Sequence, residues 1–202
     1  MSKLNNQDMN QLDDYGTVFW YKFADLLAFE FNKVPYMSPN VITSLRNIVL
    51  IHLCYKVFYK KRLDNLAVHV FIIGILDCVD GEYARKYDKI TKLGDYYDHI
   101  SDIITNLVFF YIIFKYSKSK FNFIIGLIFL FTSLQQMICM ERYRKKYLNI
   151  ETNRDSLEII ESICPVKTKN GLELFLSKYR FLGYSTYYMV MVILISKLNN
   201  KI

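Results

Sequence analysis

The hydrophobic positions of the chain come in long blocks, and most charged positions lie between the blocks. A helix that crosses a bilayer needs about 20 predominantly apolar residues. Phe121–Met140 has no charged residue, and such uncharged runs are rare in soluble cores. The pattern therefore predicts an all-α, polytopic bundle of transmembrane helices. Its five candidate spans are Val41–Tyr59, Leu66–Val79, Ile103–Phe114, Phe121–Met140 and Phe181–Ser196.

A sixth span is left open by the stretch between the last two blocks. Glu141–Arg180 contains a cluster of basic residues and Pro165, and it has no apolar run long enough to cross a membrane. It fits either a cytosolic helix or a re-entrant segment. The sequence thus predicts five to six spans.

The first 38 residues differ from the rest of the chain. Met1–Asp14 is polar and has no apolar core segment, so it does not read as a signal peptide. In the sequence that follows, Trp20, Phe23, Leu27 and Phe31 recur at helical spacing. We expect residues 16–35 to form an amphipathic helix that lies in the membrane interface or packs on the bundle.

Composition and charge narrow the class of protein. The chain is 52% hydrophobic and carries 26 Lys and Arg against 19 Asp and Glu, a net charge of +7. A nucleic-acid binder would gather its basic residues into a dense patch or stripe. Here they are scattered between the blocks, so no nucleic-acid partner is expected.

The end of the bundle with the N-terminus, Arg85 and Glu141–Arg180 is the more basic, which predicts that it faces the cytoplasm.

The four cysteines show no spacing typical of a metal site. Cys54, Cys78 and Cys139 lie in apolar runs, where a thiol behaves as a small hydrophobic group. We expect them to contribute packing only.

The residues with the clearest chemistry lie between the second and third blocks. Asp77 and Asp80 are three residues apart, and Asp98 and Asp102 are four apart, so each pair shares one face of a helix. Two helices joined by a loop near Asp88–Lys92 would aim these carboxylates at a common point. In an apolar bundle such a cluster is tolerable when divalent cations neutralise it. Oxygen ligands favour Mg²⁺ or Mn²⁺ over Zn²⁺, and such ions suit phosphoryl transfer.

Small residues and one arginine accompany the aspartates. Gly81 and Ala84 would let a ligand approach the helix backbone closely, and Gly94 would let two helices pack tightly in the bilayer. Arg85 presents a planar guanidinium suited to phosphate. The alternative is that each aspartate caps a helix and each small residue merely packs, which explains single residues but not the whole constellation.

These residues together form a recognisable pattern. Asp77-x2-Asp80-Gly81-x2-Ala84-Arg85-x8-Gly94-x3-Asp98-x3-Asp102 resembles, at every defined position, the signature of the class I CDP-alcohol phosphatidyltransferase family. Pro39-Asn40-Val41-Ile42-Thr43 resembles the element that opens the first span in that family. The resemblance implies that residues 39–202 form the transferase membrane domain. Family members usually have six spans or more, so the weak region after the fourth span is a departure.

The resemblance also implies roles for the residues that match. Asp77, Asp80 and Asp98 would bind Mg²⁺ or Mn²⁺. Asp102 would be the general base toward the acceptor hydroxyl and would also touch a metal. The cytidine and pyrophosphate site would comprise Gly81, Ala84 and Arg85, with Gly94, Asn40 and Thr43 beside it. The partners implied are a CDP-linked donor, a hydroxyl acceptor and membrane lipids; a homodimer is left open.

Two branches of the family fit the pattern. Length near 200 residues favours transfer of a phosphatidyl group from CDP-diacylglycerol to a small alcohol such as inositol, serine or glycerol phosphate. Asp98-His99 and the aromatic helix before Pro39 resemble the other branch, in which CDP-choline or CDP-ethanolamine donates to diacylglycerol. A phosphate-bearing acceptor would want an added basic cluster, for which Arg142, Arg144 and Lys145 are candidates. A prenyltransferase would need a second, distant DxxD motif, and a non-catalytic scaffold would be favoured by loss of an acidic position.

Overall fold

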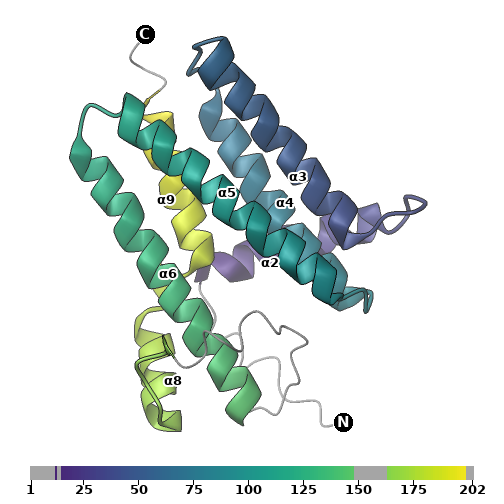
Figure 1. Ribbon diagram of the computed structural model, residues 1–202. Helices are drawn as coiled ribbons and strands as arrows, with labels where there is room; N and C mark the ends of the chain where they lie inside the picture. Colours follow the sequence, from purple (N-terminus) through teal and green to yellow (C-terminus); the bar gives the residue numbers. More distant parts are fainter. Residues whose placement is uncertain (1–11, 13–14, 148–162, 199–202) are drawn as a thin grey trace.

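The computed structural model describes residues 12, 15–147 and 163–198, and every regular element in these ranges is helical (Figure 1). The predicted all-α class is confirmed for this part of the chain. Most of Met1–Asp14 lies outside it. The elements are α2 (Tyr15–Phe31), α3 (Pro39–Cys54) with its π-helical continuation η1 (Tyr55–Tyr59), α4 (Leu66–Lys86), α5 (Lys92–Tyr116), α6 (Lys120–Tyr147), α8 (Lys169–Lys178), the 3₁₀ turn η3 (Arg180–Leu182) and α9 (Tyr184–Ser196).

The five apolar blocks fall on the long helices and on α9. Two helices are long and apolar enough to cross a membrane by length and composition, Pro39–Tyr59 and Lys120–Tyr147. Only 33% of the most apolar stretch of each is buried inside the bundle. The exposed remainder is apolar surface that a lipid environment would cover. α4 and α5 are also long, but both carry the acidic residues, and how many helices span stays a prediction.

No sixth spanning helix is seen in the described part of Glu141–Arg180. α6 continues to Tyr147, and its 28 residues correspond to about 42 Å, longer than the ~30 Å hydrocarbon core. The 10 residues of α8 correspond to only about 15 Å, too short to cross. Residues 148–162 lie outside the description.

The helix α2 packs on the bundle through a narrow stripe of small and aromatic residues. Trp20, Ala24 and Ala28 recur every four residues and are buried, while Phe23 and Leu26 on the other side are about half exposed. The stripe joins a cluster with residues of α3 and α4, including Ile42 and Tyr83. The packed alternative is therefore observed; contact of the exposed face with a membrane interface stays a prediction.

The main core lies between α3, η1, α4, α5 and α9 (Figure 1). Figure 1 also places the short α4–α5 loop at the same end of the bundle as the C-terminal end of α6, with the α3–α4 and α5–α6 connections at the opposite end. This arrangement matches the predicted grouping of the basic stretches. That this end faces the cytoplasm stays a prediction.

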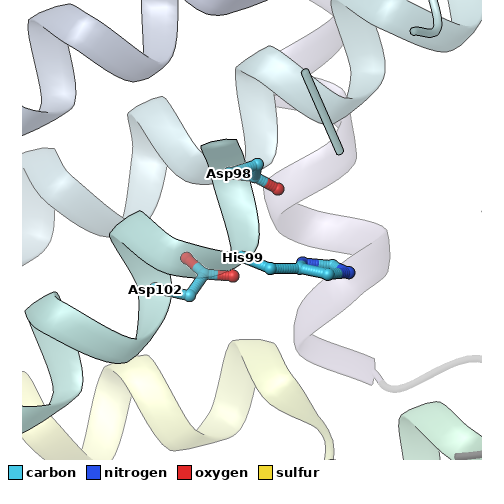
Figure 2. Close-up of side chains that lie close together, drawn as sticks. All are labelled: Asp98, His99 and Asp102. Atoms are coloured by element: carbon cyan, nitrogen blue, oxygen red, sulfur yellow. The ribbon is translucent and has the colours of Figure 1, made fainter. Parts of the chain in front are cut away.

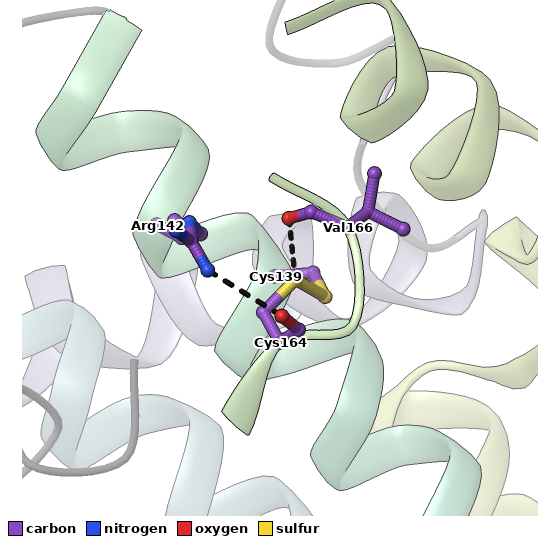
Figure 3. The surroundings of a disulfide bond; sticks show 4 residues. All are labelled: Cys139, Arg142, Cys164 and Val166. Carbon is purple, nitrogen blue, oxygen red and sulfur yellow. Dashed lines mark hydrogen bonds between the residues drawn. A yellow bond between two sulfur atoms is a disulfide. The ribbon is translucent and has the colours of Figure 1, made fainter. Parts of the chain in front are cut away.

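A second, smaller core joins α6 to α8. It is centred on a disulfide between Cys139 of α6 and Cys164 of the segment before α8 (Figure 3). The expectation that Cys139 acts only as a small hydrophobic group is wrong, because the fold brings Cys164 against it across 25 residues of sequence. Arg142 donates a hydrogen bond of 3.4 Å to the carbonyl oxygen of Cys164. The link fastens this segment to the C-terminal half of α6.

Candidate active site

Local signals in the sequence set where the site helices begin. α3 starts with Pro39 in its first turn, and the Ser38 hydroxyl accepts a hydrogen bond from the Val41 amide. α5 starts after Thr91, whose hydroxyl accepts from the Gly94 amide at 3.1 Å. Proline inside a helix start and a hydroxyl cap are both strongly favoured there. These starts fix the registers that turn the site residues inward.

The four motif aspartates gather around one arginine. The Arg46 side chain of α3 is fully buried and forms ion pairs with Asp77, with Asp98 (Nη2 to Oδ1, 3.1 Å) and with Asp102 (Nη1 to Oδ1, 2.9 Å). Asp80 is also buried and accepts a hydrogen bond of 2.8 Å from the Thr43 hydroxyl. The predicted convergence of two aspartate pairs from α4 and α5 is observed, with α3 between them.

Sequence reasoning missed Arg46. It is the one charged residue of the predicted span Val41–Tyr59 before Lys56, and ionisable groups at membrane depth are costly and usually functional. That signal was available and would have pointed to the site. If all five groups are ionised, four carboxylates and one guanidinium leave three negative charges in a small volume. The arginine offsets only part of the repulsion.

The arrangement fits one or two divalent cations. Oxygen atoms of Asp77, Asp80 and Asp98 lie within 4.8 Å of one another, and ligand atoms of Asp98, His99 and Asp102 do the same. Figure 2 shows the second group on neighbouring turns of α5. Within the described chain, Oδ1 of Asp77 and Oδ1 of Asp98 are buried and accept no hydrogen bond, although both lie beside Arg46. A mostly oxygen donor set with open lone pairs suits Mg²⁺ or Mn²⁺.

Two further predicted residues pack at the start of α3. A Cβ added at Gly94 would lie 2.8 Å from Oδ1 of Asn40 and 2.8 Å from the Thr91 hydroxyl. Only glycine fits there without moving a neighbour, so Gly94 allows α5 to approach α3 as expected. Thr43 also donates to Asp80, which places Asn40 and Thr43 at the edge of the acidic cluster.

The remaining predicted residues lie together on α4. A Cβ at Gly81 would come within 3.2 Å of the Arg85 guanidinium, so the glycine leaves space for that side chain. Arg85 also donates to Glu82 at 3.1 Å. Ala84 lies between them in the sequence and lines the same cavity.

A polar network that the sequence did not reveal holds α5 against α3. Asn47 donates to the Tyr97 hydroxyl at 3.1 Å and to Ser101 at 2.9 Å, and the Ser44 and Tyr97 hydroxyls lie 3.1 Å apart. Tyr97 and Ser101 flank Asp98 and Asp102 in the sequence. The network therefore fixes the rotation of α5 that turns both carboxylates toward Arg46. No motif marks these residues, so only the fold identifies them.

All ten predicted site residues line one cavity of about 740 Å³. That volume suits a nucleotide or a substrate of similar size. Its other walls come from α2, α6 and α9. They include Arg144, which the sequence offered as a candidate toward a phosphate-bearing acceptor, and residues that the sequence did not predict, namely Trp20, Gln136, Glu141 and Tyr184. The cavity thus joins the acidic cluster to polar groups on α6.

A family model for CDP-alcohol phosphatidyltransferase matches residues 36–196, which is most of the chain. The chain belongs to the CDP-alcohol phosphatidyltransferase family. The family supports a membrane-embedded enzyme of phospholipid synthesis that takes a CDP-alcohol donor and an alcohol acceptor and is generally dependent on divalent metal. No curated protein and no solved structure gives a significant match. The resemblance carried by the aspartate pattern is confirmed.

Proposed function

We propose that this CDP-alcohol phosphatidyltransferase moves a phosphatidyl group from CDP-diacylglycerol to a small alcohol and releases CMP, at the cytoplasmic end of a multi-pass bundle. The observation that supports this most directly is the single cavity that contains the acidic cluster, the Gly81–Arg85 face and the start of α3. A nucleotide diphosphate needs a site rich in cation-binding oxygens and a backbone it can approach closely. Both are present in one place.

Each predicted site residue has a proposed role that follows from its position in the cavity. Asp77, Asp80 and Asp98 would hold the divalent cations. When bound, those cations would offset the charge of the diphosphate and of the departing CMP. Arg85 would pair with a phosphate oxygen, and Gly81 and Ala84 would admit the nucleotide to the α4 backbone. Asn40, Thr43 and Gly94 would close the edge of the nucleotide site.

Asp102 would act as the base. Arg46 holds one of its oxygens at 2.9 Å, which fixes the carboxylate and leaves the other oxygen to accept the proton of the acceptor alcohol. The alkoxide oxygen would attack the phosphorus of the phosphatidyl group while the bond to CMP breaks. Asp102 would also contact a metal, through the group it forms with Asp98 and His99.

The reverse assignment, in which CDP-choline or CDP-ethanolamine donates to diacylglycerol, is the second candidate. The position of His99 favours it, because its ring lies with Asp98 and Asp102 in one potential ligand group, and the Asp-His pair is the local feature shared with that branch.

The test is a product assay on purified protein with Mg²⁺ or Mn²⁺. CDP-diacylglycerol is supplied with serine, ethanolamine, inositol or glycerol 3-phosphate, and CDP-choline or CDP-ethanolamine is supplied with diacylglycerol. We expect CMP and a new phospholipid from the first set. The Asp102→Asn variant should keep the fold and lose at least about 100-fold in kcat, since general acid–base catalysis contributes 10²–10⁴-fold. If only the second set gives product, the donor is CDP-choline or CDP-ethanolamine and the acceptor is diacylglycerol. If neither set gives product, the result favours a non-catalytic membrane scaffold.

A further inference from the structure

The α6 side of the cavity contains two buried polar groups that the proposed chemistry does not use. Gln136 and Glu141 both line the cavity, and they are only 5% and 6% exposed. Within the described residues, Nε2 of Gln136 and Oε1 of Glu141 are buried and have no hydrogen-bond partner. One is a hydrogen-bond donor and the other an acceptor, and both belong to a wall built by a single helix.

Unpaired polar groups at such depth are costly, and the cost is greatest for a charged one. A carboxylate oxygen and an amide NH₂ that lack partners in the protein match a ligand that supplies both a donor and an acceptor. Because a charge-assisted hydrogen bond is shorter and stronger than a neutral one, the best partner for a buried carboxylate is a cation. The ligand chemistry indicated is an ammonium group on a molecule that also carries an oxygen acceptor.

We propose that Glu141 and Gln136 form a headgroup subsite for an amino alcohol. Glu141 binds the primary ammonium, and the amide of Gln136 donates to an oxygen of the same substrate. The inference rests on the proposed transferase function and names its alcohol class. It holds for either direction of transfer, since the ammonium arrives on the acceptor in one case and on the CDP-linked donor in the other.

The basic residues of α6 that the sequence offered for a phosphate-bearing acceptor are divided between two places in the fold. Of Arg142, Arg144 and Lys145, only Arg144 lines the cavity. Arg142 instead donates to the carbonyl oxygen of Cys164 beside the disulfide. A phosphate-bearing alcohol would bring its negative charge against Glu141 with one arginine nearby, whereas an amino alcohol such as serine or ethanolamine places its positive group there.

The experiment compares alcohols and variants in the full-length protein with Mn²⁺. Wild type receives CDP-diacylglycerol with serine, ethanolamine, ethylene glycol, inositol or glycerol 3-phosphate, and separately CDP-ethanolamine with diacylglycerol. Ethylene glycol carries a hydroxyl in place of the ammonium of ethanolamine. We expect serine or ethanolamine, or CDP-ethanolamine, to be the preferred substrate, with kcat/KM at least about tenfold above that of the glycol.

The variant Glu141→Gln keeps the shape of the side chain and removes its charge. Its KM for the amino substrate should rise about tenfold or more with little change in kcat, because the lost contact binds the ground state and the transition state alike. Glu30→Gln is the matched control: Glu30 is exposed on α2 and contacts Lys33, so the same change should leave KM unaltered.

The outcomes separate the subsite from the transferase. An unchanged KM in Glu141→Gln overturns the subsite, and so does a wild type that uses inositol or glycerol 3-phosphate but no amino alcohol; in both cases the transferase stands. Absence of CMP release with every pair overturns both. If Glu141→Gln does not fold, substrate comparisons in the wild type decide alone. When CDP-diacylglycerol is the donor, equal kcat/KM values for ethanolamine and ethylene glycol overturn the subsite; when CDP-ethanolamine is the donor, equal kcat/KM values for it and for CDP-ethylene glycol overturn the subsite.

Discussion

The two sides of the cavity differ in how their polar groups are paired. On the side formed by α3, α4 and α5, Arg46 contacts three of the four aspartates and Thr43 binds the fourth. On the α6 side, Gln136 and Glu141 are also buried, and each keeps an atom with neither a hydrogen bond nor an ion pair among the described residues. The aspartate oxygens that accept no hydrogen bond lie instead against the Arg46 guanidinium. The first side is preorganised by the protein for chemistry that the whole family shares. On the second side the polar groups are paired only when a substrate is bound, as expected for the part of a cavity that selects the substrate.

The pairing on the first side is tested most severely by Arg46→Leu. Removing one partner of a buried ion-pair network costs about 3–5 kcal/mol, and here it leaves four carboxylates with no cation of the protein. We expect a large loss of thermal stability in EDTA, a larger stabilisation by Mn²⁺ than in wild type, and loss of nearly all CMP release because Asp102 is no longer held. Thermal unfolding with EDTA and with Mn²⁺ measures the first two.

Arg46→Lys is the control for that experiment. It keeps one positive charge but lacks the fork that reaches Asp98 and Asp102 at once. It should recover much of the stability in EDTA and little of the activity. An Arg46→Leu protein that unfolds in EDTA at the wild-type temperature would show that the arginine does not hold the cluster together.

The same difference between the two sides explains how far the sequence could be interpreted. The aspartates were predictable because their spacing of three and four residues places each pair on one helix face, whatever the tertiary packing. Gly94 was predictable because a glycine in a helix often marks the place where another helix packs closely against it. The positions on α3 depended on the resemblance at Pro39–Thr43, and the long apolar blocks gave the helices themselves.

The rest needed the fold because it depends on contacts between distant segments. Arg46 meets Asp102 across 56 residues, and the Asn47 network joins α3 to α5 over a similar separation. Gln136 and Glu141 belong to no motif, and their meaning comes from burial without a partner. Cys139 and Cys164 look unrelated in the sequence because only the docking of α8 brings them together.

The disulfide tests whether the α6 side depends on being fastened to α8. In the double variant Cys139→Ser, Cys164→Ser, a closed loop of 25 residues is opened, which costs up to about 3.5 kcal/mol. We expect lower thermal stability and a KM for the alcohol that rises severalfold, while the KM for the CDP-linked donor changes less. Cys54→Ser, which replaces a free thiol elsewhere, should change neither.

The oxidation state of this pair in cells bears on the orientation of the bundle. Cytosolic thiols are kept reduced, so alkylation in intact cells should find Cys139 and Cys164 as thiols if this end faces the cytoplasm. A pair that is fully oxidised in cells would contradict the predicted orientation. Equal changes in the KM of donor and alcohol in the double variant would show that the two sides of the cavity are not independent.

The smallest expected effect comes from Gly94→Ala on the motif side. The added Cβ would sit 2.8 Å from the Asn40 side chain and from the Thr91 hydroxyl that caps α5, so one or both must shift. Losing a helix cap costs about 1 kcal/mol. Because Asn40 and Gly94 lie at the proposed nucleotide site, the KM for the CDP-linked donor should rise severalfold with the KM for the alcohol unchanged. The disulfide variant is expected to show the opposite pattern, with a larger rise in the KM for the alcohol than in the KM for the donor. The matched control is Gly126→Ala, where the new Cβ meets a ring carbon of Phe110 at 2.9 Å and its nearest atoms belong to Phe110 and Met191, neither of which is a predicted site residue. It should lower stability without separating the two KM values. Steady-state kinetics with each substrate varied in turn distinguishes these results. If only the KM for the alcohol rises in Gly94→Ala, the proposed placement of the nucleotide on this side of the cavity is wrong.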